Sequence, residues 1–304
     1  MVNTKTTLCG IELDNPVIPA SGTFGYGHEF AELYDINCLG TLSMKGSTRD
    51  ARFGNPTPRI AECAGGMMNS VGLQNPGIDA VIANELPKLR KVFHKPIMAN
   101  ICGYSLEEYA ENAAKMDKAE QVAWLEINIS CPNVKAGGAA FGTDVKLASE
   151  VIRTVREATT IPLITKLSPN VTSIAEFARA AEACGSDMIS LINTLSGMAI
   201  DIETRRPKIA NLTGGLSGPA VKPVAVRMVY EASRAVKIPV IGMGGIMTGD
   251  DAVEFLLAGA SAIAVGTANF VDPMASIRVL EGIEAYLDRH GIASVSELVG
   301  ALQI

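Results

Sequence analysis

Short apolar runs recur along the chain, and each ends in polar residues or glycine before a stretch with helical spacing begins. A nearly continuous apolar run of this length predicts a β-strand that is buried on both faces. Eight such strands alternating with helices predict an α/β fold, and favour a closed (β/α)8 barrel over an open doubly wound sheet. The eight runs occupy residues 15–22, 38–46, 96–103, 123–131, 162–169, 187–194, 238–245 and 261–268.

Amphipathic stretches separate several of these runs and predict the outer helices of the barrel, because their apolar residues recur at helical spacing. No linker rich in serine, proline or charge divides the chain, so residues 1–304 are expected to form one TIM-barrel domain. The predicted helices span residues 106–119, 145–158, 174–183, 221–236 and 250–257.

Two long stretches, at 47–95 and 196–219, show no clear helix or strand of their own, and the first is rich in glycine, asparagine and proline. Long loops without such elements are usually functional or disordered. Loops that follow the strands of a barrel form its active-site face. Both insertions are therefore expected to cover the mouth of the barrel.

The composition narrows the class of protein. Hydrophobic residues make up 48% and charged residues 19%, as in a chain that forms a core. The formal net charge is −6 and no long basic run occurs, so a nucleic-acid partner is not expected. The longest uncharged stretch, 255–271, is interrupted by Gly259, Ser261 and Gly266. It therefore predicts a helix end, a turn and a strand rather than a membrane span.

The cysteines give a separate indication of compartment. They stand at positions 9, 38, 63, 102, 131 and 184 with no C-x-x-C pair, so no zinc or iron–sulfur ligand set is expected. The start of the chain, "MVNTKTTLCG", does not resemble a signal peptide. Free thiols in a reducing cytoplasm are the expected state.

Polar side chains gather at the carboxyl ends of the predicted strands, which share one face of a barrel. No Asp, Glu and His group among them would bind a metal or support paired-carboxylate chemistry, and the three histidines lie elsewhere. Metal catalysis and a Ser-His-Asp or Cys-His hydrolase are therefore not expected. The strand-end residues are Ser21, Lys45, Asn100, Asn128, Cys131, Lys166, Asn193 and Thr194.

Glycines follow the last two predicted strands, in "GMGG" (242–245) and "GT" (266–267), and "GGLSGPAVKP" (214–223) leads into a predicted helix. Exposed backbone N–H groups at this place in a barrel commonly bind phosphate. Two lysines at strand ends, Lys45 and Lys166, would be costly buried charges unless an anion compensated them. A phosphorylated ligand is expected, and FMN is one candidate among several.

The segment "NISCPNVKAGGAAFGTD" (128–144) resembles the catalytic loop of the dihydroorotate dehydrogenases. Within it, "CPNVKAGG" is similar to the NAD-linked class, class 1B. The fumarate-linked soluble class remains an alternative, and the quinone-linked class differs by a serine base and an added N-terminal segment. The resemblance extends in order over almost the whole chain, through "PASGTFGYG" (19–27), "SMKGST" (43–48), "NSVGLQNPG" (69–77), "IGMGGI" (241–246) and "VGTANF" (265–270).

This resemblance implies oxidation of (S)-dihydroorotate to orotate in de novo pyrimidine biosynthesis, with Cys131 as the general base and Lys45 beside it in the catalytic set. The residues that it implies for binding FMN are Ser21, Lys45, Gly46, Asn100, Asn128, Lys166, Ile192, Gly218, Gly244, Gly245, Gly266 and Thr267. Those that it implies for holding dihydroorotate or orotate are Lys45, Asn69, Ser70, Val71, Gly72, Leu73, Asn128, Asn133, Asn193 and Thr194.

An NAD-linked enzyme must pass electrons from FMN to NAD, yet the chain shows neither a convincing G-x-G-x-x-G after its first strand nor a cysteine cluster. The resemblance implies that a partner subunit carries FAD and a [2Fe-2S] cluster. It further implies a heterotetramer built on a homodimer of catalytic chains.

Three functions from other classes also fit a barrel with glycine loops. A dihydrouridine synthase would share the flavin but would need a basic face and a helical RNA-binding domain. A phosphate-sugar isomerase would use the glycine loops without flavin, typically with a carboxylate acid/base. A non-catalytic binding module would have no use for Cys131.

Overall fold

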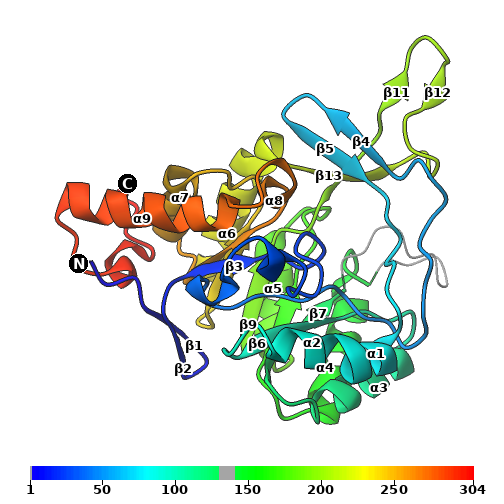
Figure 1. The fold of residues 1–304 in the computed structure, drawn as a ribbon, viewed down its shortest axis with the longest axis horizontal. Helices are drawn as coiled ribbons and strands as arrows, with labels where there is room; N and C mark the ends of the chain where they lie inside the picture. The colour runs from blue at the N-terminus through cyan, green and yellow to red at the C-terminus, as the bar shows by residue number, and fades with distance from the viewer. Residues whose placement is uncertain (1, 130–140) are drawn as a thin grey trace.

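The computed structural model describes residues 2–129 and 141–304. A parallel sheet of seven strands forms its centre, with helices packed around it (Figure 1). Each of the seven strands coincides with an apolar run that predicts it, and only β7 begins one residue before its run. In sheet order they are β3 (Val17–Pro19), β15 (Ala262–Val265), β14 (Val240–Met243), β9 (Met188–Leu191), β8 (Leu163–Lys166), β7 (Val122–Asn128) and β6 (Ile97–Ile101).

The remaining predicted strand, at 38–46, closes the gap between the two edge strands β3 and β6. On one side the N–H of Ser43 donates to the carbonyl of Pro19 at 3.1 Å. On the other side Met44 and Met98 are hydrogen-bonded at 3.0 Å. The backbone is too irregular here to form a named strand, but its bonds complete the predicted eight-membered barrel.

The outer helices match the amphipathic stretches to within three residues at their ends, and two of the five have the predicted bounds. Ser105 caps the first of them and a capping box of Thr248 and Asp251 starts the last. These helices are α3 (Leu106–Met116), α4 (Val145–Ala158), α5 (Ile174–Ala183), α6 (Lys222–Ala235) and α7 (Gly249–Leu257).

Further helical segments lie where the pattern predicts none. The longest is α9 (Ala275–His290), and a second group runs through α1 (Ile78–Ala80), the π-helical turn η3 (Val81–Glu85) and α2 (Leu86–Arg90). The short ones are α8 (Ala268–Val271), η1 (Phe30–Glu32), η2 (Ile36–Cys38), η4 (Pro219–Val221) and η5 (Val295–Leu298). Within the described ranges, no helix is both long enough and apolar enough to cross a membrane.

Two layers of apolar side chains stabilise the barrel. One lies between the sheet and the helices. The other fills the interior, where Met98, Trp124, Ile164 and Met188 meet across facing strands. The hairpin of β1 (Thr6–Leu8) and β2 (Ile11–Leu13) closes the amino-terminal end, since Leu8 joins this interior cluster.

The two insertions form a sheet of their own, so the expectation that they lack elements is wrong. Four short strands pair antiparallel in the order β10-β13-β5-β4. Two come from the second insertion, β10 (Leu195–Gly197) and β13 (Gly214–Ser217), and two from the first, β5 (Gly66–Asn69) and β4 (Ile60–Cys63). A further hairpin, β11 (Ile200–Asp201) with β12 (Arg206–Pro207), projects away from the barrel (Figure 1).

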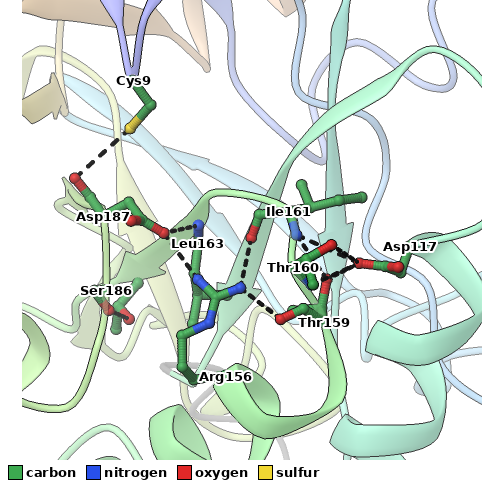
Figure 2. A network of polar contacts seen from close by, with 10 residues as sticks. Cys9, Asp117, Arg156, Thr159, Thr160, Ile161, Leu163, Ser186 and Asp187 are labelled. Carbon is green, nitrogen blue, oxygen red and sulfur yellow. Dashed lines mark hydrogen bonds and ion pairs between the residues drawn. The ribbon is translucent and has the colours of Figure 1, made fainter.

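A polar network ties α4 to the amino-terminal ends of β8 and β9 (Figure 2). The guanidinium of Arg156 donates to the Asp187 carboxylate at 2.9 Å and to the carbonyls of Thr159 and Ile161 at 2.6 and 3.0 Å. The same carboxylate accepts from the backbone N–H of Leu163 at 2.8 Å. One arginine therefore connects the end of a helix with the starts of two barrel strands.

Replacing Arg156 with alanine is expected to lower the free energy of unfolding by about 2 kcal/mol, because the Asp187 carboxylate and two carbonyls lose a charged donor. Chemical denaturation of the purified chain measures this. Arg153→Ala is the matched control, since Arg153 is exposed on the same helix, and a change of at most about 0.5 kcal/mol is expected there. Equal losses in the two variants would contradict a role for the network.

Candidate functional site

A cavity of about 410 Å³ opens at the carboxyl ends of the barrel strands. Its walls come from the segments that follow β3, β9, β14 and β15, and from the last residues of β7 and β8. Side chains of the antiparallel sheet, including Ile60, Met67 and Leu216, roof it. The insertions thus cover the barrel mouth as expected, and the volume suits a small-molecule site.

The structure brings most of the predicted site residues together on this one cavity. They come from separate strand ends and from the roof, although they are spread over most of the chain. Those that line it are Ser21, Lys45, Asn69, Val71, Gly72, Leu73, Asn128, Lys166, Ile192, Asn193, Thr194, Gly218, Gly244, Gly245, Gly266 and Thr267.

Three predicted residues lie behind the cavity wall rather than on it. Gly46 is buried against Asn100, whose Oδ1 would lie 2.5 Å from a Cβ at that glycine. Asn100 is itself 1% exposed. Ser70 is fully buried, and its hydroxyl accepts from the Asn55 amide at 3.0 Å. Direct binding roles for these three stay predictions.

Two further predicted residues, Cys131 and Asn133, lie outside the described residues. Along the sequence, the last described residue before them is Ile129, directly after the carboxyl end of β7. There the hydroxyl of Tyr109 donates to the carbonyl of Asn128 at 2.8 Å. This bond from α3 fixes the end of the strand that leads into the predicted catalytic loop.

The charged side chains among the described cavity residues are those of Lys45 and Lys166. No carboxylate is among those lining residues, so the cavity is suited to an anionic ligand. The described part of the chain also holds no cluster of three His, Cys, Asp or Glu that could bind a metal ion. Cys9, Cys38, Cys63 and Cys184 are free thiols, as expected.

A glycine cradle, defined here as Gly218, Gly244 and Gly245, forms one wall. All three have positive φ, at 101°, 127° and 81°, a region that favours glycine. A Cβ on Gly245 would lie 2.8 Å from the carbonyl oxygen of Gly218, so the two loops touch backbone to backbone. Beside the cradle, Thr267 donates to the hydroxyl of Ser217 at 2.8 Å. Close backbone approach of this kind leaves room for a phosphate.

Amide side chains line another part of the cavity. The Asn193 amide donates to the side-chain oxygen of Asn128 at 3.2 Å, which joins the ends of β7 and β9. Asn69 reaches the cavity from the roof, at the end of β5. Amides both donate and accept hydrogen bonds, so this side suits a ligand ring with alternating donors and acceptors.

Glu126 is a residue of the site region that the sequence analysis missed. It lies one interior position below Asn128 on β7, is 2% exposed, and accepts hydrogen bonds from the side chains of Asn100 and Ser190 at 2.6 and 2.7 Å. Burial raises the pKa of Glu126, but the charge of Lys166 and these hydrogen bonds outweigh it, so the pKa lies below its ordinary value. The sequence feature that could have identified Glu126 is an acidic residue within the otherwise apolar run "AWLEINI".

Comparisons with known proteins agree with this geometry. The dihydroorotate dehydrogenase family model matches residues 3–287. A solved structure of DHODH from Eimeria tenella in complex with ferulenol superposes with a TM-score of 0.83 at 24% identity, over 98% of this chain and 88% of that one. At that identity the likeness supports the barrel fold alone.

Several relatives are much closer in sequence, and each is named dihydroorotate dehydrogenase B (NAD(+)), catalytic subunit. The protein of Geotalea uraniireducens is 59% identical over 97% of this chain and 96% of its own length. That of Geobacter metallireducens is 58% identical over 98% and 97%. That of Alkaliphilus metalliredigens is 56% identical over 99% of both. The chain therefore belongs to the dihydroorotate dehydrogenase family.

Proposed function

We propose that the chain oxidises dihydroorotate to orotate in pyrimidine biosynthesis, as the FMN-containing catalytic subunit of an NAD-linked dihydroorotate dehydrogenase. The observation that carries the proposal is a glycine-walled cavity with two lysines at the mouth of a barrel of this family. The whole chain, residues 1–304, acts as one domain.

The residues present fit FMN on two observations. The cradle of Gly218, Gly244 and Gly245 has no room for a Cβ at its closest approach, which leaves backbone N–H groups for a phosphate. Lys166 lines the same cavity and suits the pyrimidine edge of a flavin, where negative charge develops on reduction. The other residues proposed to hold FMN are Ser21, Lys45, Gly46, Asn100, Asn128, Ile192, Gly266 and Thr267.

The reaction removes a proton from C5 and a hydride from C6 of dihydroorotate, and bound FMN supplies the hydride acceptor. Cys131 is the base for the C5 proton, as its thiolate. Lys45 and the backbone of 71–73 bind the substrate carboxylate. Its ring, with alternating amide donors and acceptors, is held by Asn69, Asn128, Asn133, Asn193 and Thr194, with Ser70 beside them.

The names of the relatives favour NAD over fumarate as the acceptor. NAD is then reached through a partner subunit that carries FAD and a [2Fe-2S] cluster, in a heterotetramer with a homodimeric core of catalytic chains. The complex is cytoplasmic and needs neither membrane nor nucleic acid. Membership of the dihydroorotate dehydrogenase family disfavours the dihydrouridine synthase, isomerase and binding-module alternatives.

The visible spectrum of the purified chain tests the proposal. We expect flavin absorbance that bleaches within seconds when dihydroorotate is added without oxygen, and slow NAD reduction until the partner subunit is added. Flavin absorbance that dihydroorotate does not change would contradict the substrate. A colourless chain that cannot be reconstituted with FMN would contradict the cofactor, and rapid NAD reduction by the isolated chain would contradict the partner.

A further inference from the structure

A carboxylate lies inside the barrel, directly beneath the cavity. Interior positions alternate along β7 as Trp124, Glu126 and Asn128, and only the last lines the cavity. In register, Asn128 pairs with Lys166 on β8. Glu126 therefore lies one interior layer deeper than the lysine.

Three donors from three other segments hold this carboxylate in place. One oxygen, Oε2, accepts from the Asn100 amide at 2.6 Å and from the hydroxyl of Ser43 at 3.0 Å. The other, Oε1, accepts from the hydroxyl of Ser190 at 2.7 Å. Since these donors are themselves buried, the position of the negative charge is fixed without help from Lys166.

Lys166 is the fourth neighbour, and its contact is longer. Its Nζ lies 3.8 Å from Oε2 of Glu126, whereas charge-assisted hydrogen bonds are about 2.7–2.9 Å long. The ammonium is thus close enough to be stabilised by the carboxylate but is not engaged by a short bond. It keeps donor hydrogens for a ligand in the cavity that it lines.

We infer that Glu126 is a positioning residue for the reaction, a fixed counter-ion that holds the Lys166 ammonium at the cavity edge, where it stabilises negative charge on a bound flavin. This inference rests on the proposed function for the identity of the ligand. Glu126 does not line the cavity, so its effect reaches the ligand through Lys166.

Removing the negative charge of Glu126 should affect a bound flavin only through Lys166. In Glu126→Gln, Lys166 would be a buried cation without its carboxylate, in a cavity that it shares with Lys45. The cost of burial and the repulsion from Lys45 would no longer be offset, so the ammonium would withdraw from the flavin edge. The flavin would then lose the stabilisation of added negative charge, as it would in Lys166→Met.

The test is a double-mutant cycle on the flavin midpoint potential, measured by spectroelectrochemical titration of FMN-loaded chains. We expect a more negative potential in Glu126→Gln and in Lys166→Met, with no further change when both are combined. Flavin reduction by dihydroorotate should slow about tenfold to a hundredfold in Glu126→Gln, with KM little changed. Ser190→Ala, which removes one donor and keeps the charge, should leave the potential near that of the wild type.

Two results would overturn the inference: a more positive potential in Glu126→Gln, or an equal shift with and without Lys166. If Glu126→Gln fails to fold while the double variant folds, the carboxylate is needed because the lysine is charged, which supports the inference. If both fail to fold, the carboxylate is needed by the barrel itself, which overturns it. A wild-type chain that takes up no FMN would overturn the proposed function instead.

Discussion

Replacing Cys131 with serine is expected to slow reduction of the bound flavin by dihydroorotate about a thousandfold at neutral pH, since general-base catalysis contributes roughly 10²–10⁴. A serine hydroxyl occupies nearly the same space as a thiol but is a far weaker acid, so it offers almost no anion to take the C5 proton. Stopped-flow absorbance without oxygen measures the rate. Binding of orotate should change little, because the change removes no hydrogen-bonding group.

Cys184→Ser is the matched control for this change, since Cys184 is a buried free thiol that does not line the cavity. Its flavin should be reduced at a rate within a few-fold of the wild type. A Cys131→Ser variant that reduces as fast as Cys184→Ser would remove Cys131 from the mechanism. The flavin and substrate assignments would then stand without an identified base.

Replacing Gly245 with alanine is expected to raise the Kd for FMN about a hundredfold, because one or two charge-assisted hydrogen bonds to the phosphate would be lost. The added Cβ would lie 2.8 Å from the carbonyl oxygen of Gly218, so the two loops of the cradle must separate. The N–H groups that approach the phosphate then move with them. Equilibrium titration of the apoprotein with FMN, followed by fluorescence quenching, gives the Kd.

Gly10→Ala is the control variant, because it introduces the same backbone strain as Gly245→Ala without the steric clash. Gly10 also has φ of 81°, but a Cβ there meets nothing within 4 Å, and it lies in the β1–β2 turn at the far end of the barrel. Both variants should lose about 1 kcal/mol of stability for the left-handed conformation. Only Gly245→Ala should lose FMN affinity, and equal affinities in the two variants would contradict phosphate binding by the cradle.

The barrel could be predicted because its strands are buried on both faces and so read as apolar runs. Even residues 38–46, which form no named strand, were recognised by this pattern, and their hydrogen bonds place them between β3 and β6. The helix α9 was not predicted, although its buried residues recur at helical spacing, at Ala275, Val279, Ile283 and Leu287. The segment α1–η3–α2 was harder, because Pro87 interrupts it and the helical repeat changes at the π-helical turn.

The roof could not have been predicted from local pattern. Its strands are three or four residues long, too short for alternation to be visible, and β5 pairs with β13 from the other insertion. Pairing at such a separation depends on the barrel that brings the insertions together. Residues 47–95 and 196–219 therefore look like loops when each is read alone.

The candidate site was recognised from residue types at strand ends and from the family resemblance, and most of those residues do meet on one cavity. The notable omission, Glu126, shows the limit of looking only at strand ends. Its role depends on what lies one layer below, where Asn100, Ser43 and Ser190 meet from separate segments. The sequence shows a buried acid there, but not its partners.

The pairing of β5 with β13 also has a consequence for how the protein is made. The register that joins Asn69 to Gly215 spans nearly half of the chain, and contacts of such long range form late and slowly. During synthesis the roof cannot close until the ribosome has released residue 217. Retention of FMN would then require an almost finished polypeptide, and the yellow colour would mark chains that have completed folding.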